Sequence, residues 1–192
     1  MTSGFPRPTE LAQVWIREVI QPGDTVVDAT TGNGYDTHFL AECVTPTGKV
    51  HAFDIQQQAI DAAQRHCENH HNIHWHLASH ATLETHLSLA RAVMFNLGYL
   101  PGAAHTCITT VSDTLAAIDA ACCILQDGGR ITIVCYPGHS GGDEETSAVL
   151  NHVAGLSTAW QVVKYEKIGT LRPAPILIGI SKRQFPLAKS TR

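Results

Sequence analysis

The sequence predicts an α/β fold, a single domain built on a mostly parallel seven-stranded sheet with helices on both faces. Short β-branched runs alternate with segments of helical periodicity along most of the chain, which is typical of parallel strands joined by helices. Gly32 and Gly34 closely follow the first such run, where a strand would turn sharply into a helix. With 192 residues, 44% hydrophobic and 16% charged, the chain has the size and balance of one globular domain, and we assign 1–192 to it.

The first half of the chain supplies four strands and most of their connecting helices. Apolar residues at helical spacing predict a helix at about 9–20 with Thr9 as its N-cap. A strand over DTVVDAT follows, and then a helix over DTHFLAECV with Asp36 as its cap. Three further strands are predicted over KVHAFDI, NIHWHLA and RAVMFNLG. A helix over QQAIDAAQRHCEN joins the first two of these, and a short helix near 82–89 precedes the last.

The second half begins with a helix over VSDTLAAIDAACCIL, after which Gly128 and Gly129 turn the chain into the strand RITIVCYP. The segment GDEETSAVLNHVAGL predicts a helix that is capped by acids at its start. The last two strands, WQVVKYEKIG and PILIGISKR, are separated only by TLRPA. Because no helix fits between them, we expect them to form an antiparallel edge of the sheet. A ligand of such a fold binds at the carboxyl ends of the strands.

Composition excludes several classes of site and location. None of the six cysteines forms a C-x-x-C pair, which favours reduced core cysteines. Histidines cluster in HCENHHNIHWH, but a second ligand pair at zinc spacing is missing, so we expect no metal site. No run of about 18 apolar residues or export signal is present, which predicts a cytoplasmic protein.

The net charge of −4 is distributed unevenly. Residues 164–192 hold seven Lys or Arg and one acid, or +6, whereas residues 1–163 hold six bases and sixteen acids, or −10. A basic end on an acidic domain is typical of a segment that faces a polyanion such as RNA. A solvated surface with a basic tail at about 182–192 explains the same asymmetry, and both interpretations stay open.

The glycine-rich turn is flanked by acids that distinguish between nucleotide ligands. Asp54 ends the next strand, where a carboxylate can accept the hydroxyls of a ribose. A dinucleotide fingerprint G-x-G-x-x-G would need a glycine where the chain has Thr37, and Asp28 would repel a pyrophosphate. The sulfonium and ammonium groups of S-adenosylmethionine are cations that suit Asp28 and the polar Asn33. The sequence therefore favours S-adenosylmethionine.

The fourth strand ends in FNLGYLPG, which places an amide at the same edge of the sheet. The side-chain oxygen of Asn96 can accept a hydrogen bond from an amine and aim its lone pair at a methyl group. The aromatic ring of Tyr99 can pack against a base. These residues predict a nitrogen substrate, although a loop that only turns the chain is the alternative.

Several motifs together resemble one known family. The segments DATTGNGYDTHFLA, AFDIQ, FNLGYLPG and CYPGHSGGDEE occur in this order, with Ser79–His80 and Thr109–Thr110 between them. From about Thr9 to Lys182 the chain resembles the YtqB-like "putative rRNA methylases", which are MnmM-type tRNA methyltransferases. The resemblance implies a class I S-adenosylmethionine-dependent methyltransferase fold (Rossmann-like). It also implies methyl transfer to the amine of 5-aminomethyl-(2-thio)uridine at the tRNA wobble position.

The resemblance also implies roles for residues at the matching positions. The methionine end of the cofactor would be lined by Asp28, Thr30, Gly32, Asn33, Gly34 and Asp36. The ribose would be held by Asp54 and Gln56, the adenine would lie near Ser79 and His80, and the transferring methyl group would be bordered by Asn96, Leu97 and Gly98. Thr31 and Pro137 depart from the family pattern, in which Met and, in some members, His occupy these positions. The segment TLRPAPILI also lacks the Asn-x-Pro-Pro form that is frequent in the family.

Catalysis is expected to depend on Asn96, Tyr136 and His139. An alkylamine is largely protonated at neutral pH, so a proton must leave before the nitrogen attacks the methyl group in line. His139 is the candidate acceptor of that proton, although a loop histidine bonded to the backbone is equally compatible. Tyr136 could orient the uracil.

Three other functions stay open. A methyltransferase of this kind could act on rRNA or on a small-molecule amine. A nicotinamide-dependent oxidoreductase is opposed by Thr37, and a non-catalytic RNA-binding module is opposed by the intact Asp28, Asp54 and Asn96. A homodimer is compatible with the sequence, and nothing in it specifies one.

Overall fold

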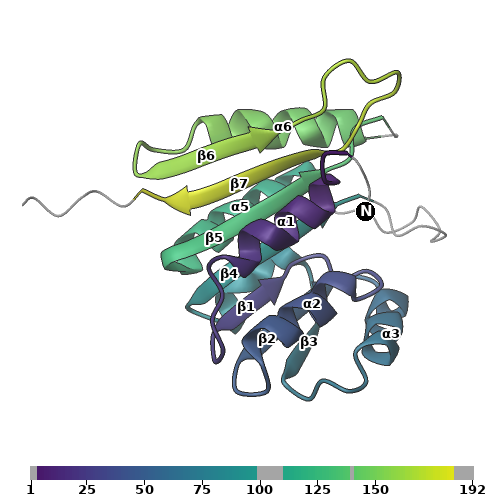
Figure 1. The fold of residues 1–192 in the computed structure, drawn as a ribbon, viewed down its shortest axis with the longest axis vertical. Coiled ribbons are helices and arrows are strands. Elements are labelled where there is room, and N and C mark those ends of the chain that lie inside the picture. Colours follow the sequence, from purple (N-terminus) through teal and green to yellow (C-terminus); the bar gives the residue numbers. More distant parts are fainter. Residues whose placement is uncertain (1–3, 99–109, 139–140, 184–192) are drawn as a thin grey trace, which may run out of the picture.

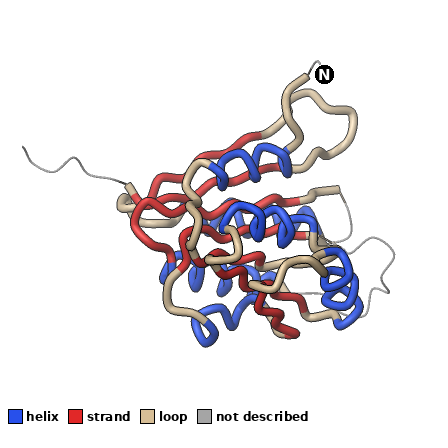
Figure 2. The backbone as a smooth tube through the Cα atoms, turned by 60° about the horizontal axis from the view of Figure 1, so that its bottom comes forward, coloured by secondary structure: helices blue, strands red, loops and turns tan. Residues whose placement is uncertain are grey.

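The computed structural model describes residues 4–98, 110–138 and 141–183, in which one sheet lies between two layers of helices (Figures 1 and 2). Seven strands form the sheet in the order β3-β2-β1-β4-β5-β7-β6. The strands are β1 (Thr25–Asp28), β2 (Lys49–Asp54), β3 (Ile73–Leu77), β4 (Ala90–Leu97), β5 (Leu125–Cys135), β6 (Trp160–Tyr165) and β7 (Ile176–Lys182). The mostly parallel sheet with helices on both faces that the sequence predicts is confirmed.

Helices cover the two faces of the sheet in separate groups. The helices are α1 (Pro8–Arg17), α2 (Tyr35–Val44), α3 (Gln57–His66), the 3₁₀ turn η1 (His80–Thr82), α4 (Leu83–His86), α5 (Val111–Ile124) and α6 (Gly142–Ala154). In Figure 1, α1 and α2 lie in front of the sheet, and α5 and α6 lie behind it.

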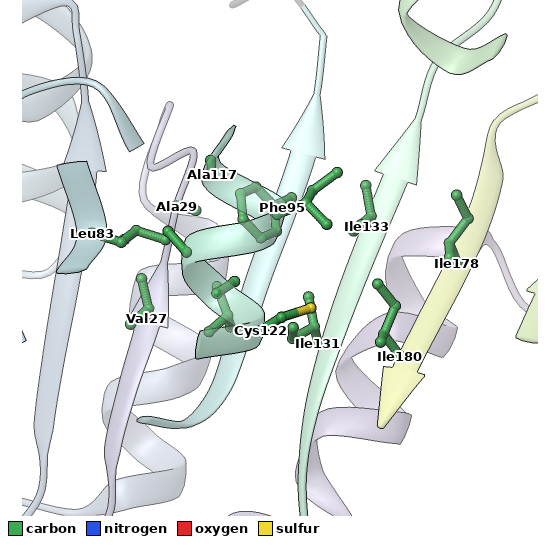
Figure 3. Packing of buried hydrophobic residues seen from close by; sticks show 14 of the residues in the cluster. Val27, Ala29, Leu83, Phe95, Ala117, Cys122, Ile131, Ile133, Ile178 and Ile180 are labelled. Atoms are coloured by element: carbon green, nitrogen blue, oxygen red, sulfur yellow. The ribbon is translucent and has the colours of Figure 1, made fainter. Parts of the chain in front are cut away.

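Alternation along each strand divides the buried core into two clusters. On β1, Val26 packs with α1 and α2, whereas Val27 packs on the opposite face with α5. Figure 3 shows the second cluster, where Phe95, Ile131 and Ile178 from neighbouring strands project on the same face of the sheet, with α5 packed over part of it. This alternation follows from the period of two in a strand, and burial of both faces explains why these strands read as nearly continuous apolar runs.

The last two strands pair antiparallel at one edge of the sheet, as the sequence predicts, and β7 is the inner strand of the two. β7 pairs antiparallel with β5 through Ile131↔Ile180 and Cys135↔Ile176, and β6 pairs antiparallel with β7 on the outside. Burial explains this order, because the first five residues of β7 are buried whereas the middle of β6 is exposed. The more apolar strand therefore takes the inner position, and Trp160–Tyr165, which also carries Gln161 and Lys164, forms the edge.

Several predicted boundaries were wrong at the ends of elements. Helix α1 is capped by Arg7 with Pro8 at its first position, and it ends at Arg17, so Thr9 lies inside the helix. The acids that open α6 lie within its first turn, and its N-cap is Gly141. Strand β5 begins at Leu125, before the two glycines, because a register shift against Ala90 and Ala92 accommodates them within the strand.

The region predicted as a short helix near 82–89 is also shorter than expected, since η1 and α4 together end at His86. No helix within the described ranges is long and apolar enough to cross a membrane. The same residues contain no group of three His, Cys, Asp or Glu side chains that could hold a metal ion.

Candidate functional site

Three polar residues meet at the carboxyl ends of adjacent strands. Asp54, Asp28 and Asn96 lie at or near the ends of β2, β1 and β4, which are neighbours in the sheet. The chain crosses from one side of β1 to the other at this point, since β2 and β3 lie on one side and β4 on the other. Such a switch point leaves a crevice in which α/β proteins bind their ligands.

The glycine-rich turn between β1 and α2 has a backbone that requires glycine. Gly32 has φ of +51° and Gly34 has φ of +83°. A Cβ atom on Gly34 would lie only 2.8 Å from the Cα atom of Ala63 on α3. Gly34 is also the N-cap of α2, so the prediction that Asp36 caps this helix was wrong. The turn therefore brings bare backbone close to the switch point, as a ligand-binding turn requires.

Asp54 links the glycine turn to the end of β2. Its two carboxylate oxygens accept the backbone N–H groups of Gly32 and Gln56, both at 2.9 Å. A carboxylate offers about four lone-pair sites, so these bonds leave acceptor capacity for two further donors. The side chain is only half-buried, and a ligand with paired hydroxyl groups can reach it.

Asp28 has a different environment, because its side chain is fully buried. The hydroxyl of Thr37 donates to one of its oxygens at 2.6 Å, and the backbone N–H of Thr30 donates to the other at 3.2 Å. Burial, together with the charge of Asp36, raises the pKa of Asp28 from 3.8 to about 7. Asp28 therefore holds the start of the turn from inside, whereas Asp54 presents a carboxylate at its mouth.

The raised pKa of Asp28 predicts how stability changes with pH. In the unfolded chain Asp28 ionises near pH 4, but in the folded protein it stays protonated until about pH 7. Its contribution to stability is therefore fully present below pH 4 and is lost as the pH rises through 7. Asp28→Asn mimics the protonated side chain and does not titrate. Its free energy of unfolding should therefore rise by about 1 kcal/mol or more relative to that of the wild type as the pH increases from 5.5 to 8.

Urea unfolding at several pH values measures this difference. Asp61→Asn is the matched control, because Asp61 is an exposed carboxylate on α3. A constant stability difference between the Asp28→Asn variant and the wild type across this pH range would contradict the prediction.

Asn96 is held in one orientation by a network that starts on α1. Its backbone N–H donates to the Thr30 hydroxyl at 2.7 Å, and its side-chain Nδ2 donates to Oδ2 of Asp36. The other oxygen of Asp36 accepts Nε2 of Gln13 at 2.7 Å. A carboxylate can only accept, so the amide nitrogen of Asn96 must face Asp36. Its Oδ1 therefore points elsewhere, and this buried oxygen has no hydrogen-bond partner among the described residues.

Gln13 is a member of this hydrogen-bond network that the sequence does not reveal. It belongs to a helix whose apolar spacing draws attention to other positions, and its partner Asp36 lies on a different helix. The available signal was a polar residue next to Ala12, a buried position of α1. That signal does not identify the partner.

Tyr136 joins the same cluster from the end of β5. A Cβ atom on Gly98 would lie 3.2 Å from Cδ2 of Tyr136, so the ring packs directly on the backbone after β4. Burial raises the pKa of Tyr136, and the charge of Asp36 raises it further. The phenol is therefore a neutral hydrogen-bonding group beside Asn96 at neutral pH.

The remaining predicted residues take more peripheral positions. His80 is buried, burial lowers its pKa, and its Nδ1 lies 3.1 Å from the carbonyl oxygen of Ala29. The hydroxyl of Ser79 accepts the N–H of Ala81 as the cap of η1. Leu97 is buried, and Asn33 is exposed on the turn. His139, Tyr99 and Thr109 lie outside the described residues.

Comparison with known proteins identifies relatives along almost the whole chain. A sequence profile of the family described as "Putative rRNA methylase" matches residues 50–181. The chain is 37% identical to the chloroplastic tRNA (mnm(5)s(2)U34)-methyltransferase of Arabidopsis thaliana, over 94% of this chain and 71% of the relative.

Two crystal structures are similar in both sequence and fold. One is a "putative rRNA-methylase" from Clostridium thermocellum, with 34% identity, a TM-score of 0.91, and coverage of 94% of this chain and 100% of the other. The second is a "putative methyltransferase" from Streptococcus mutans in complex with SAH, with 36% identity, a TM-score of 0.86 and the same coverage.

Proposed function

The chain belongs to the "Putative rRNA methylase" family, and we propose that it is an S-adenosylmethionine-dependent tRNA methyltransferase. Its substrate is the primary amine of 5-aminomethyl-(2-thio)uridine at the wobble position. The observation that carries this function is the amide of Asn96, whose Nδ2 is held by Asp36 and whose buried Oδ1 has no partner in the described part of the chain. Such an oxygen is a ready acceptor for the N–H of an amine.

The described residues fit S-adenosylmethionine at the switch point. Asp54 keeps acceptor capacity for the ribose hydroxyls after binding Gly32 and Gln56. The carboxylate of Asp36 supplies negative charge near the end of β4, which suits a cationic ligand. Gly32 and Gly34, with φ of +51° and +83°, leave the turn beside these strand ends without side chains, so a ligand can meet its backbone there. The neighbour from Streptococcus mutans, with SAH bound, supports the same cofactor class.

The chain's own residues position the amine and the cofactor. The cofactor, when bound, supplies a methyl group on a sulfonium. Asn96 Oδ1 accepts an N–H of the substrate amine, which fixes the direction of the nitrogen lone pair. Tyr136 contributes a neutral ring beside the same point, against which the uracil packs. His139 stays the proposed proton acceptor.

Mass spectrometry of nucleosides tests this function directly. Hypomodified tRNA is incubated with the purified protein and S-adenosylmethionine, then digested and compared with a reaction that lacks the protein. We expect a gain of one methyl group on 5-aminomethyluridine-type nucleosides. Methylation of rRNA or of a small amine, with those nucleosides unchanged, would reject the proposed substrate and retain the reaction class.

A further inference from the structure

The loop between β6 and β7 carries two exposed cations and two exposed aliphatic side chains. Lys167 and Arg172 are exposed, and neither forms an ion pair within the part of the chain that the structure describes. Between them, Ile168 is 96% exposed and Leu171 is 104% exposed. Aliphatic side chains this exposed gain nothing from the fold of their own domain. We call residues 167–172 the loop tip.

The loop tip is tied to the rim of the candidate site by contacts on both sides. The hydroxyl of Tyr165 donates to the carbonyl oxygen of Pro6 at 3.0 Å, which joins the loop to the segment before α1. A Cβ atom on Gly138 would lie 2.9 Å from Cβ of Pro173, so the loop also packs beside the end of β5. Tyr136, in the candidate site, precedes Gly138 by two residues. Figure 1 shows this loop beside the N-terminal segment, at the end of the sheet where β5 ends.

The fold separates the loop tip from the other basic residues near the C-terminus. Because β7 runs antiparallel to β5, the first residue of β7 pairs with Cys135. The last residues of β7 lie beside Arg130, at the opposite end of the strands. There Lys182 lies 3.3 Å from Asp127, and Nε of Arg183 donates to the carbonyl of Trp160. The described basic residues of the segment expected to face RNA therefore lie at two opposite ends of the strands, and only Lys167 and Arg172 are at the end near the site.

We propose that the loop tip is a contact surface for the RNA substrate. Lys167 and Arg172 bind phosphates, and Ile168 and Leu171 pack on bases that are unstacked in a loop of the RNA. RNA loops expose such bases, and backbone phosphates are held by Lys and Arg. The inference rests on the proposed function for the identity of the RNA.

Charge favours RNA over a second copy of this chain as the occupant. The nearby cations Arg7 and Lys164 are already paired with Glu10 and Glu166 at 2.7 Å each. Lys167 and Arg172 form no such ion pair among the described residues, so we expect them to be the cations that a polyanion meets at this rim. Glu10, whose pKa is lowered by Arg7 and to a smaller extent by Lys167, is the acid near them. A second copy would present its acids over a folded surface, with −10 in residues 1–163 and one short acidic segment at the start of α6, whereas RNA concentrates its charge along one strand.

Binding of a fluorescently labelled tRNA anticodon stem-loop to the intact protein tests the proposal. Lys167→Ala/Arg172→Ala is compared with Lys182→Ala/Arg183→Ala, which removes the same two charges at the opposite end of the strands. The first variant should bind roughly tenfold more weakly at about 50 mM salt. Its slope of log affinity against log salt should fall by about 1.4, from about 0.7 per lost phosphate contact. The second variant should resemble the wild type.

A third variant separates the apolar contacts from the charged ones. Ile168→Ser/Leu171→Ser should weaken binding by about tenfold, since two aliphatic side chains that the bound RNA would cover are lost. The salt slope should stay unchanged, because no charge is removed. Equal effects of the two charge variants, or none from either, would overturn the proposal. A shift of the monomer–dimer equilibrium with unaltered RNA binding would assign the loop tip to self-association and would also overturn it.

Failure of the proposed function gives a different pattern. In that case the wild-type protein itself neither methylates nor binds the tRNA, and the loop-tip variants do not differ from it. If the wild type methylates tRNA and the loop variants bind it normally, only the loop proposal is wrong.

Discussion

Asp54→Ala is expected to weaken S-adenosylmethionine binding by about 100-fold, because the change removes a charged acceptor for two ribose hydroxyls. Hydrogen bonds to charged groups contribute about 1.5–3 kcal/mol each. The same carboxylate accepts the N–H groups of Gly32 and Gln56 at 2.9 Å, so its loss also loosens the glycine turn. Both effects act on the same ligand. Titration calorimetry with S-adenosylmethionine or its demethylated product measures the dissociation constant.

Asp61→Ala is the control for Asp54→Ala, since it removes an exposed carboxylate from the helix that follows β2. The control should bind the cofactor as the wild type does. Thermal melts provide a second measurement, because a ligand that binds only the folded state raises the melting temperature. That rise should disappear in Asp54→Ala. Wild-type affinity in Asp54→Ala would show that Asp54 serves the turn alone and does not contact the ligand.

The overall fold could be predicted because its signals are local. The alternation of Val26 and Val27 between two cores, and the glycines after β1, are properties of a few neighbouring residues. The inner position of β7 could not be predicted from a local signal, since it depends on which of the two last strands is more apolar along its whole length. The N-cap of α2 was predicted wrongly for a related reason. Asp is favoured as an N-cap, but Gly34 with φ of +83° already occupies that position.

The candidate site could be predicted where it lies at strand ends, and not where it depends on helix packing. The convergence of Asp28, Asp54 and Asn96 could be predicted because the carboxyl ends of neighbouring parallel strands lie together. Gln13 was missed, since nothing in the spacing of α1 shows that it faces Asp36. The basic residues of 164–192 are continuous in sequence, which predicts one surface. The antiparallel direction of β7 separates Lys167 and Arg172 from Lys182 and Arg183 within the described part of the chain.

Asn96→Ala is expected to lower kcat for methyl transfer by about 100-fold or more, while cofactor affinity changes much less. Its Oδ1 is the acceptor proposed for the substrate amine, and a misplaced nucleophile costs about that factor. Single-turnover assays with saturating tRNA and S-adenosylmethionine measure the chemical step. Asn151→Ala is the control, because Asn151 is exposed on α6. A normal kcat in Asn96→Ala would remove Asn96 from the proposed reaction.

Gln13→Ala tests whether the Asn96 amide works alone or through its network. Gln13 does not contact Asn96, but its Nε2 holds the Asp36 carboxylate that receives the Asn96 amide. Loss of one donor lets Asp36 and then Asn96 reorient, so kcat should fall by about tenfold. The KM for tRNA should stay nearly unchanged, because Gln13 positions the amide and does not bind RNA. In the Asn96→Ala background the same change should have no further effect on kcat, since two residues acting through one group are not additive. Additive losses would mean that Gln13 stabilises the fold independently of the amide.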